Sequence, residues 1–366
     1  MPYSLRQIVL YMLRLGALGF GGPVALIGYM HRDLVEQRRW ISEEDYKDGL
    51  ALAQLAPGPL AAQMAIYLGF VDYGVLGATL VGLAFVLPSF LIVIVLGWAY
   101  QAYGGLAWMQ AVFYGVGASV IGIIAISAYR LTRKTIGRDW VLWLVFTIVA
   151  AVTIATESEK VIVILGAGLL VWLLKAPPGW TSTTLRNLVV VPGLLWDIFI
   201  FFGKAGAFVF GSGLAIVPFL YGGVVKEYHW LNDKQFIDAV AVAMITPGPV
   251  VITVAFIGYL VAGLWGAVVA ALATFLPCYL FTVIPAPYFK KYAKRKDIAA
   301  FVTGVTAAAT GAIAGAVVVL GRRSIVDWPT ATVAVISALL LLQKRRIPEP
   351  LIVASAALIG WMVRVP

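Results

Sequence analysis

The sequence contains little charge. Of its 366 residues only 12% are Asp, Glu, Lys or Arg, whereas 62% are hydrophobic and the mean hydropathy is +0.95. Soluble domains carry roughly 25% charged residues. The net charge of +10 comes from Lys and Arg in short loops between apolar runs, where such residues set membrane orientation. The composition therefore excludes a soluble domain, does not indicate a nucleic-acid surface, and predicts an all-α integral membrane protein.

Groups for metal or cofactor chemistry are also scarce. The chain has one cysteine, Cys278, and two histidines, so we expect neither an internal disulfide nor a cysteine metal cluster. The motifs GxxxxGKS, HExxH and GxSxG do not occur. We therefore predict no cofactor, no metal site and no enzymatic activity.

The tripeptide Pro-Gly-Pro occurs twice, at Pro57–Pro59 and Pro247–Pro249, each time inside a long apolar stretch. Proline removes a backbone donor and clashes with the preceding turn, so each copy ends one helix and lets another begin. Such a break inside a membrane is tolerated where it is buried in protein or lines a wet cavity. We therefore expect broken or re-entrant helices at both motifs, which is typical of transporters.

The chain consists of two similar halves. When the first half is shifted by 190 positions, 13 of the 45 residues 16–60 are identical, including Trp40 with Trp230 and both Pro-Gly-Pro motifs. Later helices follow with a gap of one residue, which aligns Pro88 with Pro277. We predict a first transmembrane repeat over 1–175, a linker over 176–192 and a second transmembrane repeat over 193–366.

The basic loops predict that the two halves are inverted. In the first half the basic loop, 130–138, follows the fourth apolar segment, whereas in the second half the richest loop, 290–296, follows the third. If basic loops are cytoplasmic, corresponding loops face opposite sides, as in inverted-repeat transporters. Arg322 and Arg323 then fall on the outer side, which does not fit this pattern.

Several stretches resemble the chromate ion transporter family: FGGPVALIGY (20–29), ALAQLAPGP (51–59) and FIDAVAVAMITPGP (236–249). The resemblance covers both halves. It implies a multi-pass transporter in the bacterial or archaeal plasma membrane that exports chromate, with sulfate as the isosteric competitor. The family's second half usually has Gly-Gln where this chain has Ala243-Met244, so Gln54 has no amide counterpart and the two half-sites are chemically unequal.

A tetrahedral dianion in the membrane needs donors and positive potential, because an uncompensated charge is costly there. Helix N-termini after the two breaks, at Leu60–Gln63 and Val250–Thr253, offer free N–H groups and about half a positive charge. Arg14 and Lys204 are equivalent intramembrane cations. The residues expected around the anion are Arg14, Phe20, Gly21, Gly22, Gln54, Pro57, Gly58, Pro59, Gln63, Lys204, Gly211, Ser212, Thr246, Pro247, Gly248 and Pro249.

Several of these features also have plainer interpretations. The glycine-rich breaks are alternatively close-packing surfaces, which is our interpretation of Gly304, Gly311 and Gly315. Arg14 and Lys204 are alternatively snorkelling side chains, with the charge at the membrane surface. The equivalent residues Asp48 and Asp238 are either a coupling-proton site or structural partners.

The residues leave the cargo and the driving force open. Sulfate or another small oxyanion shares the charge and shape of chromate, and a membrane-embedded enzyme acting on a lipid phosphate is a remote alternative. Proton antiport, anion exchange and a potential-driven uniport all agree with the sequence. The expected partners are the oxyanion and membrane lipid, and the sequence is compatible with a homodimer.

Overall fold

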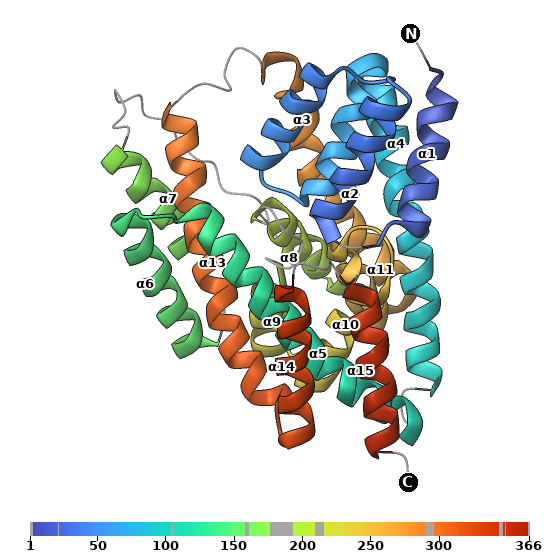
Figure 1. Cartoon of the computed structure of the whole chain (residues 1–366), viewed down its shortest axis with the longest axis vertical. Helices are drawn as coiled ribbons and strands as arrows, with labels where there is room; N and C mark the ends of the chain where they lie inside the picture. Colours follow the sequence, from blue (N-terminus) through green and yellow to red (C-terminus); the bar gives the residue numbers. More distant parts are fainter. Residues whose placement is uncertain are drawn as a thin grey trace.

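The computed structural model describes residues 3–20, 22–103, 106–157, 161–175, 193–208, 216–289, 296–343, 347 and 349–364. Over these residues the fold contains helices and no strand (Figure 1). The first half contains α1 (Leu5–Leu18), α2 (Gly22–Met30), the π-helix η1 (His31–Gln37), α3 (Glu43–Leu55), α4 (Leu60–Tyr103), α5 (Ala107–Thr135), α6 (Trp140–Thr156) and α7 (Val161–Lys175). The second half contains α8 (Leu194–Phe208), α9 (Ile216–Tyr221), the π-helix η3 (Gly222–Glu227), α10 (Asp233–Ile245), the short 3₁₀ helix η4 (Val250–Ile252), α11 (Thr253–Val283), η5 (Ala286–Tyr288), α13 (Lys296–Ser324), α14 (Trp328–Leu342) and α15 (Glu349–Arg364).

Four stretches among the described residues are long and apolar enough to cross a membrane: Leu60–Tyr103, Ala107–Arg133, Val250–Tyr288 and Ala300–Ser324. A span needs about 20 predominantly apolar residues, and each of these exceeds that length. The prediction of an all-α, multi-pass membrane protein is therefore confirmed. The predicted linker and the basic loop residues 290–295 lie outside the described residues.

The same unusual local features recur in the two halves. Each half has a π-helix followed by a residue with left-handed backbone, Arg39 (φ 55°) and His229 (φ 52°). The next helix is then capped by Ser42 or Asn232, whose side chain accepts a hydrogen bond from a backbone N–H of its first turn. These positions are 190 residues apart, so the shift that aligns the sequences also aligns their local structure.

Glycines allow the long helices α4 and α11 to fold back on themselves. Each is interrupted by a glycine with positive φ, Gly74 (56°) and Gly263 (60°), a conformation that costs glycine little. On either side of the first kink, the backbones at Gly69 and Gly77 touch, and a Cβ at either position would overlap the other's carbonyl. Each helix therefore consists of a short arm packed tightly against a long arm.

The halves exchange their last helices. The pair α6 and α7 of the first half packs on α13, whereas the pair α14 and α15 of the second half packs on α5 (Figure 1). Glycines allow this approach, because Gly311 and Gly315 of α13 face backbone carbonyls of α6, and Gly304 faces α7. The interpretation of these three glycines as packing surfaces is confirmed. The two halves therefore share their core instead of folding as separate bodies.

An ion-pair cluster accounts for one arginine that did not fit the topology. Arg323, at the end of α13, pairs with Glu157 at 2.6 Å and with Asp233. Lys226 also pairs with Glu157, at 2.5 Å. Hydrogen bonds from Lys226 and the charge of Arg323 hold the pKa of the Glu157 carboxyl below its usual range. Arg323 therefore has a structural role, because its ion pairs join the end of α13 to the end of α6 and to the start of α10.

The contact between α1 and α4 depends on a glycine. A Cβ on Gly16 would overlap the carbonyl oxygen of Phe85, which is backbone and cannot rotate away. We expect Gly16→Ala to destabilise the protein by roughly 1–3 kcal/mol, the usual cost of overpacking. The measurement is the apparent thermal midpoint of the purified protein in detergent.

Gly28→Ala is the matched control for this prediction. Gly28 lies within α2, and nothing is found within 4 Å of where its Cβ would be. The same substitution there should leave the midpoint unchanged or raise it slightly, because alanine favours a helix. Equal midpoints for the two variants would show that the α1–α4 contact is looser than described.

Candidate functional site

The first break is closed by a buried glutamine. α3 ends at Leu55 and α4 begins at Leu60, and between them Gly58 has a φ of 141°. The Gln63 side chain is fully buried and its Nε2 donates a hydrogen bond to the Pro57 carbonyl at 2.8 Å. The Gln63 Oε1 is also buried and has no hydrogen-bond partner among the described residues. A buried acceptor without a hydrogen bond costs free energy of folding. The Gln63 Oε1 therefore indicates that the first break has room for a further hydrogen-bond donor.

The second break is closed differently. α10 ends at Ile245, and Gly248 (φ 91°) donates its backbone N–H to the Gly19 carbonyl at 2.9 Å. Thr253, the equivalent of Gln63, is buried and its hydroxyl donates to the Val250 carbonyl at 2.7 Å. The Thr246 hydroxyl donates to Val242 in the same way. The half-sites thus differ at a second pair of equivalent positions. The sequence predicted a difference between Gln54 and Met244, and the structure adds one between Gln63, which bonds across the break, and Thr253, which bonds within its own turn.

Each break packs against the long helix of the other half. A Cβ on Gly58 would lie 3.2 Å from the Cβ of Cys278 in α11, and a Cβ on Gly248 would overlap the Ser89 hydroxyl in α4. Cys278 and Ser89 each follow the proline inside their helix, so they are equivalent residues. Both Pro-Gly-Pro motifs therefore lie beside the α4–α11 contact, where the two halves meet.

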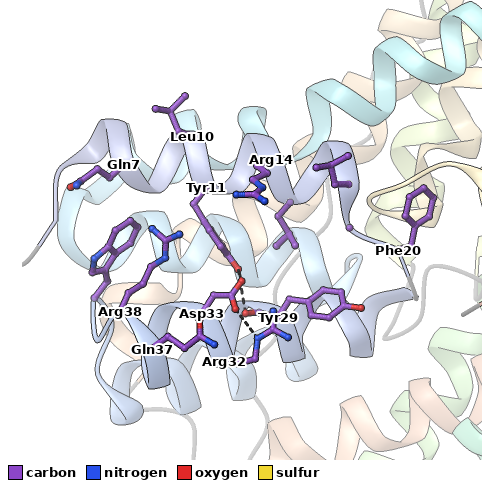
Figure 2. Close-up of a pocket in the computed structure, with 14 residues that line it drawn as sticks. Gln7, Leu10, Tyr11, Arg14, Phe20, Tyr29, Arg32, Asp33, Gln37 and Arg38 are labelled. Atoms are coloured by element: carbon purple, nitrogen blue, oxygen red, sulfur yellow. Dashed lines mark hydrogen bonds and ion pairs between the residues drawn. The ribbon is translucent and has the colours of Figure 1, made fainter. Parts of the chain in front are cut away.

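A separate cavity of about 840 Å³ opens between α1 and η1 (Figure 2). Of the predicted site residues it contains Arg14 and Phe20, together with Arg32, Asp33 and Arg38. The Asp33 carboxylate accepts hydrogen bonds from the Tyr11 hydroxyl at 3.2 Å and from Arg32 Nε at 2.8 Å. Figure 2 shows Tyr11 reaching from α1 to Asp33, with Arg14 and Arg38 on either side of it.

The predicted residues therefore fall into separate groups. The two Pro-Gly-Pro motifs, Gln63 and Thr246 lie at the breaks, whereas Arg14 and Phe20 line the cavity, whose lining includes no residue of either break. Gln54 and Lys204 are exposed. Gly22 begins α2, and Gly21, Gly211 and Ser212 lie outside the described residues.

The two candidate coupling carboxylates have different surroundings. Asp238 is 3% exposed and accepts a hydrogen bond of 2.7 Å from the hydroxyl of Tyr100, at the far end of α4. Asp48 is half-buried in α3. No group of three or more potential metal ligands occurs in the described part of the chain.

Sequence reasoning missed Ser89, Cys278 and Tyr100 as partners of the breaks and of Asp238. The repeat contained a signal for the first two, because each directly follows one of the aligned prolines. Nothing in the sequence indicated Tyr100, since it meets Asp238 only through the packing of α4 against α10.

Comparisons with known proteins agree on one family. The family model described as "Chromate transporter" matches residues 6–172 and 196–361. A chromate transport protein of Cupriavidus metallidurans is 68% identical over 98% of this chain and 93% of its own length. A probable chromate transport protein of Synechococcus elongatus is 64% identical (98% and 95%), and a chromate transport protein of Pseudomonas aeruginosa is 32% identical (99% and 93%). No solved structure matches the chain.

The role of the Gln63 side chain in closing the first break can be tested by replacing its amide with an apolar group. Gln63→Leu leaves the Pro57 carbonyl without that partner, so we expect a loss of roughly 1–3 kcal/mol, seen as a lower apparent thermal midpoint. Gln54→Leu is the matched control, because Gln54 is exposed and exposed substitutions stay within about 0.5 kcal/mol. Equal midpoints for the two variants would contradict the role of Gln63 in closing the break.

Proposed function

The chain belongs to the chromate transporter family, and from that premise we propose that it is a secondary transporter that exports chromate across the plasma membrane. The observation that carries this proposal is the 68% identity to a chromate transport protein over nearly the whole chain. At this identity the two proteins share both halves and therefore the elements around both breaks.

We propose further that the halves form an inverted repeat. Support comes from the positions of equivalent elements, because α3 lies in the upper part of Figure 1 and its equivalent α10 lies in the lower part. In such a repeat, the two Pro-Gly-Pro hairpins enter from opposite sides and their tips approach the middle of the membrane.

The proposed binding site is the region of the two breaks. The N–H groups that open α4 and η4 provide donors and positive potential for a dianion, because the first turn of a helix has free amides. Glycine at each break adopts the positive φ of the turn and lets a side chain of the other half approach the backbone closely. Gln63 adds an amide that can turn its Nε2 from the Pro57 carbonyl to an anion. The buried site thus replaces water around the anion with fixed donors.

Coupling to another ion is assigned to the two equivalent carboxylates. Asp238 is buried and hydrogen-bonded to Tyr100, so a change of its protonation would act on the contact between α10 and the end of α4. Asp48 occupies the same position in the first half. Proton antiport is the form of coupling that would use both residues.

The test is uptake of labelled chromate by everted membrane vesicles. Vesicles containing the protein should accumulate chromate, and excess sulfate should slow this uptake, because backbone donors distinguish tetrahedral dianions poorly. Gly248→Ala should reduce the initial rate by about tenfold or more, since its Cβ would overlap the Ser89 hydroxyl and a barrier raised by roughly 1.4 kcal/mol slows a rate tenfold.

Gly28→Ala serves as the control and should keep the wild-type rate, because its Cβ meets nothing within 4 Å. Uptake is compared at equal amounts of protein in the membrane. Vesicles that accumulate no more chromate than empty ones would overturn the proposed cargo. A full rate in Gly248→Ala would overturn the placement of the site at the breaks.

A further inference from the structure

The cavity between α1 and η1 has an excess of positive charge. Three guanidinium groups, those of Arg14, Arg32 and Arg38, line it together with one carboxylate, that of Asp33. Asp33 is already engaged by Arg32 and by the Tyr11 hydroxyl. Within the described part of the chain, Arg14 and Arg38 therefore have no carboxylate partner in the cavity.

Arg38 is held in place by aromatic rings instead of by an acid. Its guanidinium carbon lies 4.7 Å from the centre of the Trp40 ring and 5.5 Å from that of Tyr11. Contact with two ring faces holds a guanidinium in position while the N–H donors at its edge stay free for a ligand. The side chain is thus oriented for a ligand and not consumed by an ion pair.

At the equivalent place in the other half, aromatic rings pack together among the described residues. Arg38 and Tyr11 correspond to Tyr228 and Phe201. The Phe201 ring packs on the backbone of Gly223 and lies 5.6 Å from the Tyr228 ring and 5.7 Å from the Trp230 ring, measured between centres. Arg32 and Asp33 correspond to the two glycines Gly222 and Gly223.

This difference shows that the repeated fold does not require the cavity. Both halves keep the π-helix and the left-handed residue after it, but only the first half carries the arginines. Arg32 and Arg38 are replaced in the other half by Gly222 and Tyr228, so the architecture does not need their charges, and a ligand explains them. The ligand must be anionic, because it faces three guanidinium groups and a single carboxylate that is already paired.

We propose that this cavity is a second oxyanion site, in which Arg14, Arg32 and Arg38 bind a tetrahedral oxyanion group. Guanidinium groups match the oxygens of such a group in pairs. A volume of about 840 Å³ admits a hydrated free anion or a lipid phosphate, and the cavity also has an apolar wall that includes Leu10 and Leu18. The inference rests on the proposed function only in its choice of chromate as a probe.

Direct binding tests the site without requiring transport. Purified full-length protein in nanodiscs of neutral phosphatidylcholine is titrated with labelled chromate, and with labelled phosphate in parallel, at low salt. Arg38→Gln should weaken binding at this site by about ten- to hundredfold, the effect of losing one charged hydrogen-bonding group. Arg38→Lys keeps the charge and should fall between Arg38→Gln and the wild type.

Arg39→Gln is the matched control, because Arg39 is the adjacent exposed arginine and is not part of the cavity lining. Elution as a single peak on size exclusion confirms that each variant is folded. Repeating the titration in Gly58→Ala separates the two sites, because a Cβ at Gly58 would meet Gln63 and Cys278, and neither residue lines the cavity. Binding that persists there without transport would support the cavity site even if the proposed function fails.

A second arm identifies the source of the oxyanion group. Native mass spectrometry of protein exposed to phosphatidylglycerol and phosphatidylcholine should show the anionic lipid retained by the wild type and lost in Arg38→Gln if the group is a lipid phosphate. If the group is a free anion, chromate or phosphate binds and anionic lipid does not displace it. Equal binding by the wild type, Arg38→Gln and Arg39→Gln in both arms would overturn the proposal.

Discussion

A broken helix inside a membrane must have its exposed backbone groups satisfied by protein, because hydrocarbon offers them no partner. The fold of this chain meets that requirement at two places with different chemistry. The Pro57 carbonyl receives the Gln63 amide, whereas the Gly248 N–H donates to the Gly19 carbonyl at another interruption of the chain. The second break is thus held by a contact between the halves, and it depends on glycine for close approach. The arrangement of the long helices follows from keeping these breaks buried.

The exchange of helix pairs explains how the breaks can be held rigidly. Because α6 and α7 pack on α13 while α14 and α15 pack on α5, neither half has a complete core alone. The two long helices α4 and α11 pack against each other, and each carries the residue that meets the other half's Pro-Gly-Pro. A shift of one half would therefore alter both breaks together, which is the kind of coupled change that alternating access needs.

Much of this could be predicted from local sequence, and the rest depends on packing. The breaks, the repeat and the equivalence of Pro88 with Pro277 follow from proline, glycine and simple alignment. The helix exchange could not be predicted, because glycines mark close contact without naming the partner. The sequence suggested one anion site that included Arg14, but the structure places Arg14 with Arg38 in a cavity that reaches the second break only through Gly19. Tertiary contacts likewise account for Arg323, whose carboxylate partners lie far from it in sequence.

The central claim is that equivalent parts of the two halves enter the membrane from opposite sides. It is tested by placing single cysteines at Glu44 and Lys234, equivalent exposed positions at the start of α3 and α10, in a Cys278→Ser background. Serine is a suitable replacement, because Ser89 occupies the equivalent place in the first half. A membrane-impermeant maleimide should label one of the two cysteines on intact cells and the other only after permeabilisation. Labelling of both from the same side would contradict the account.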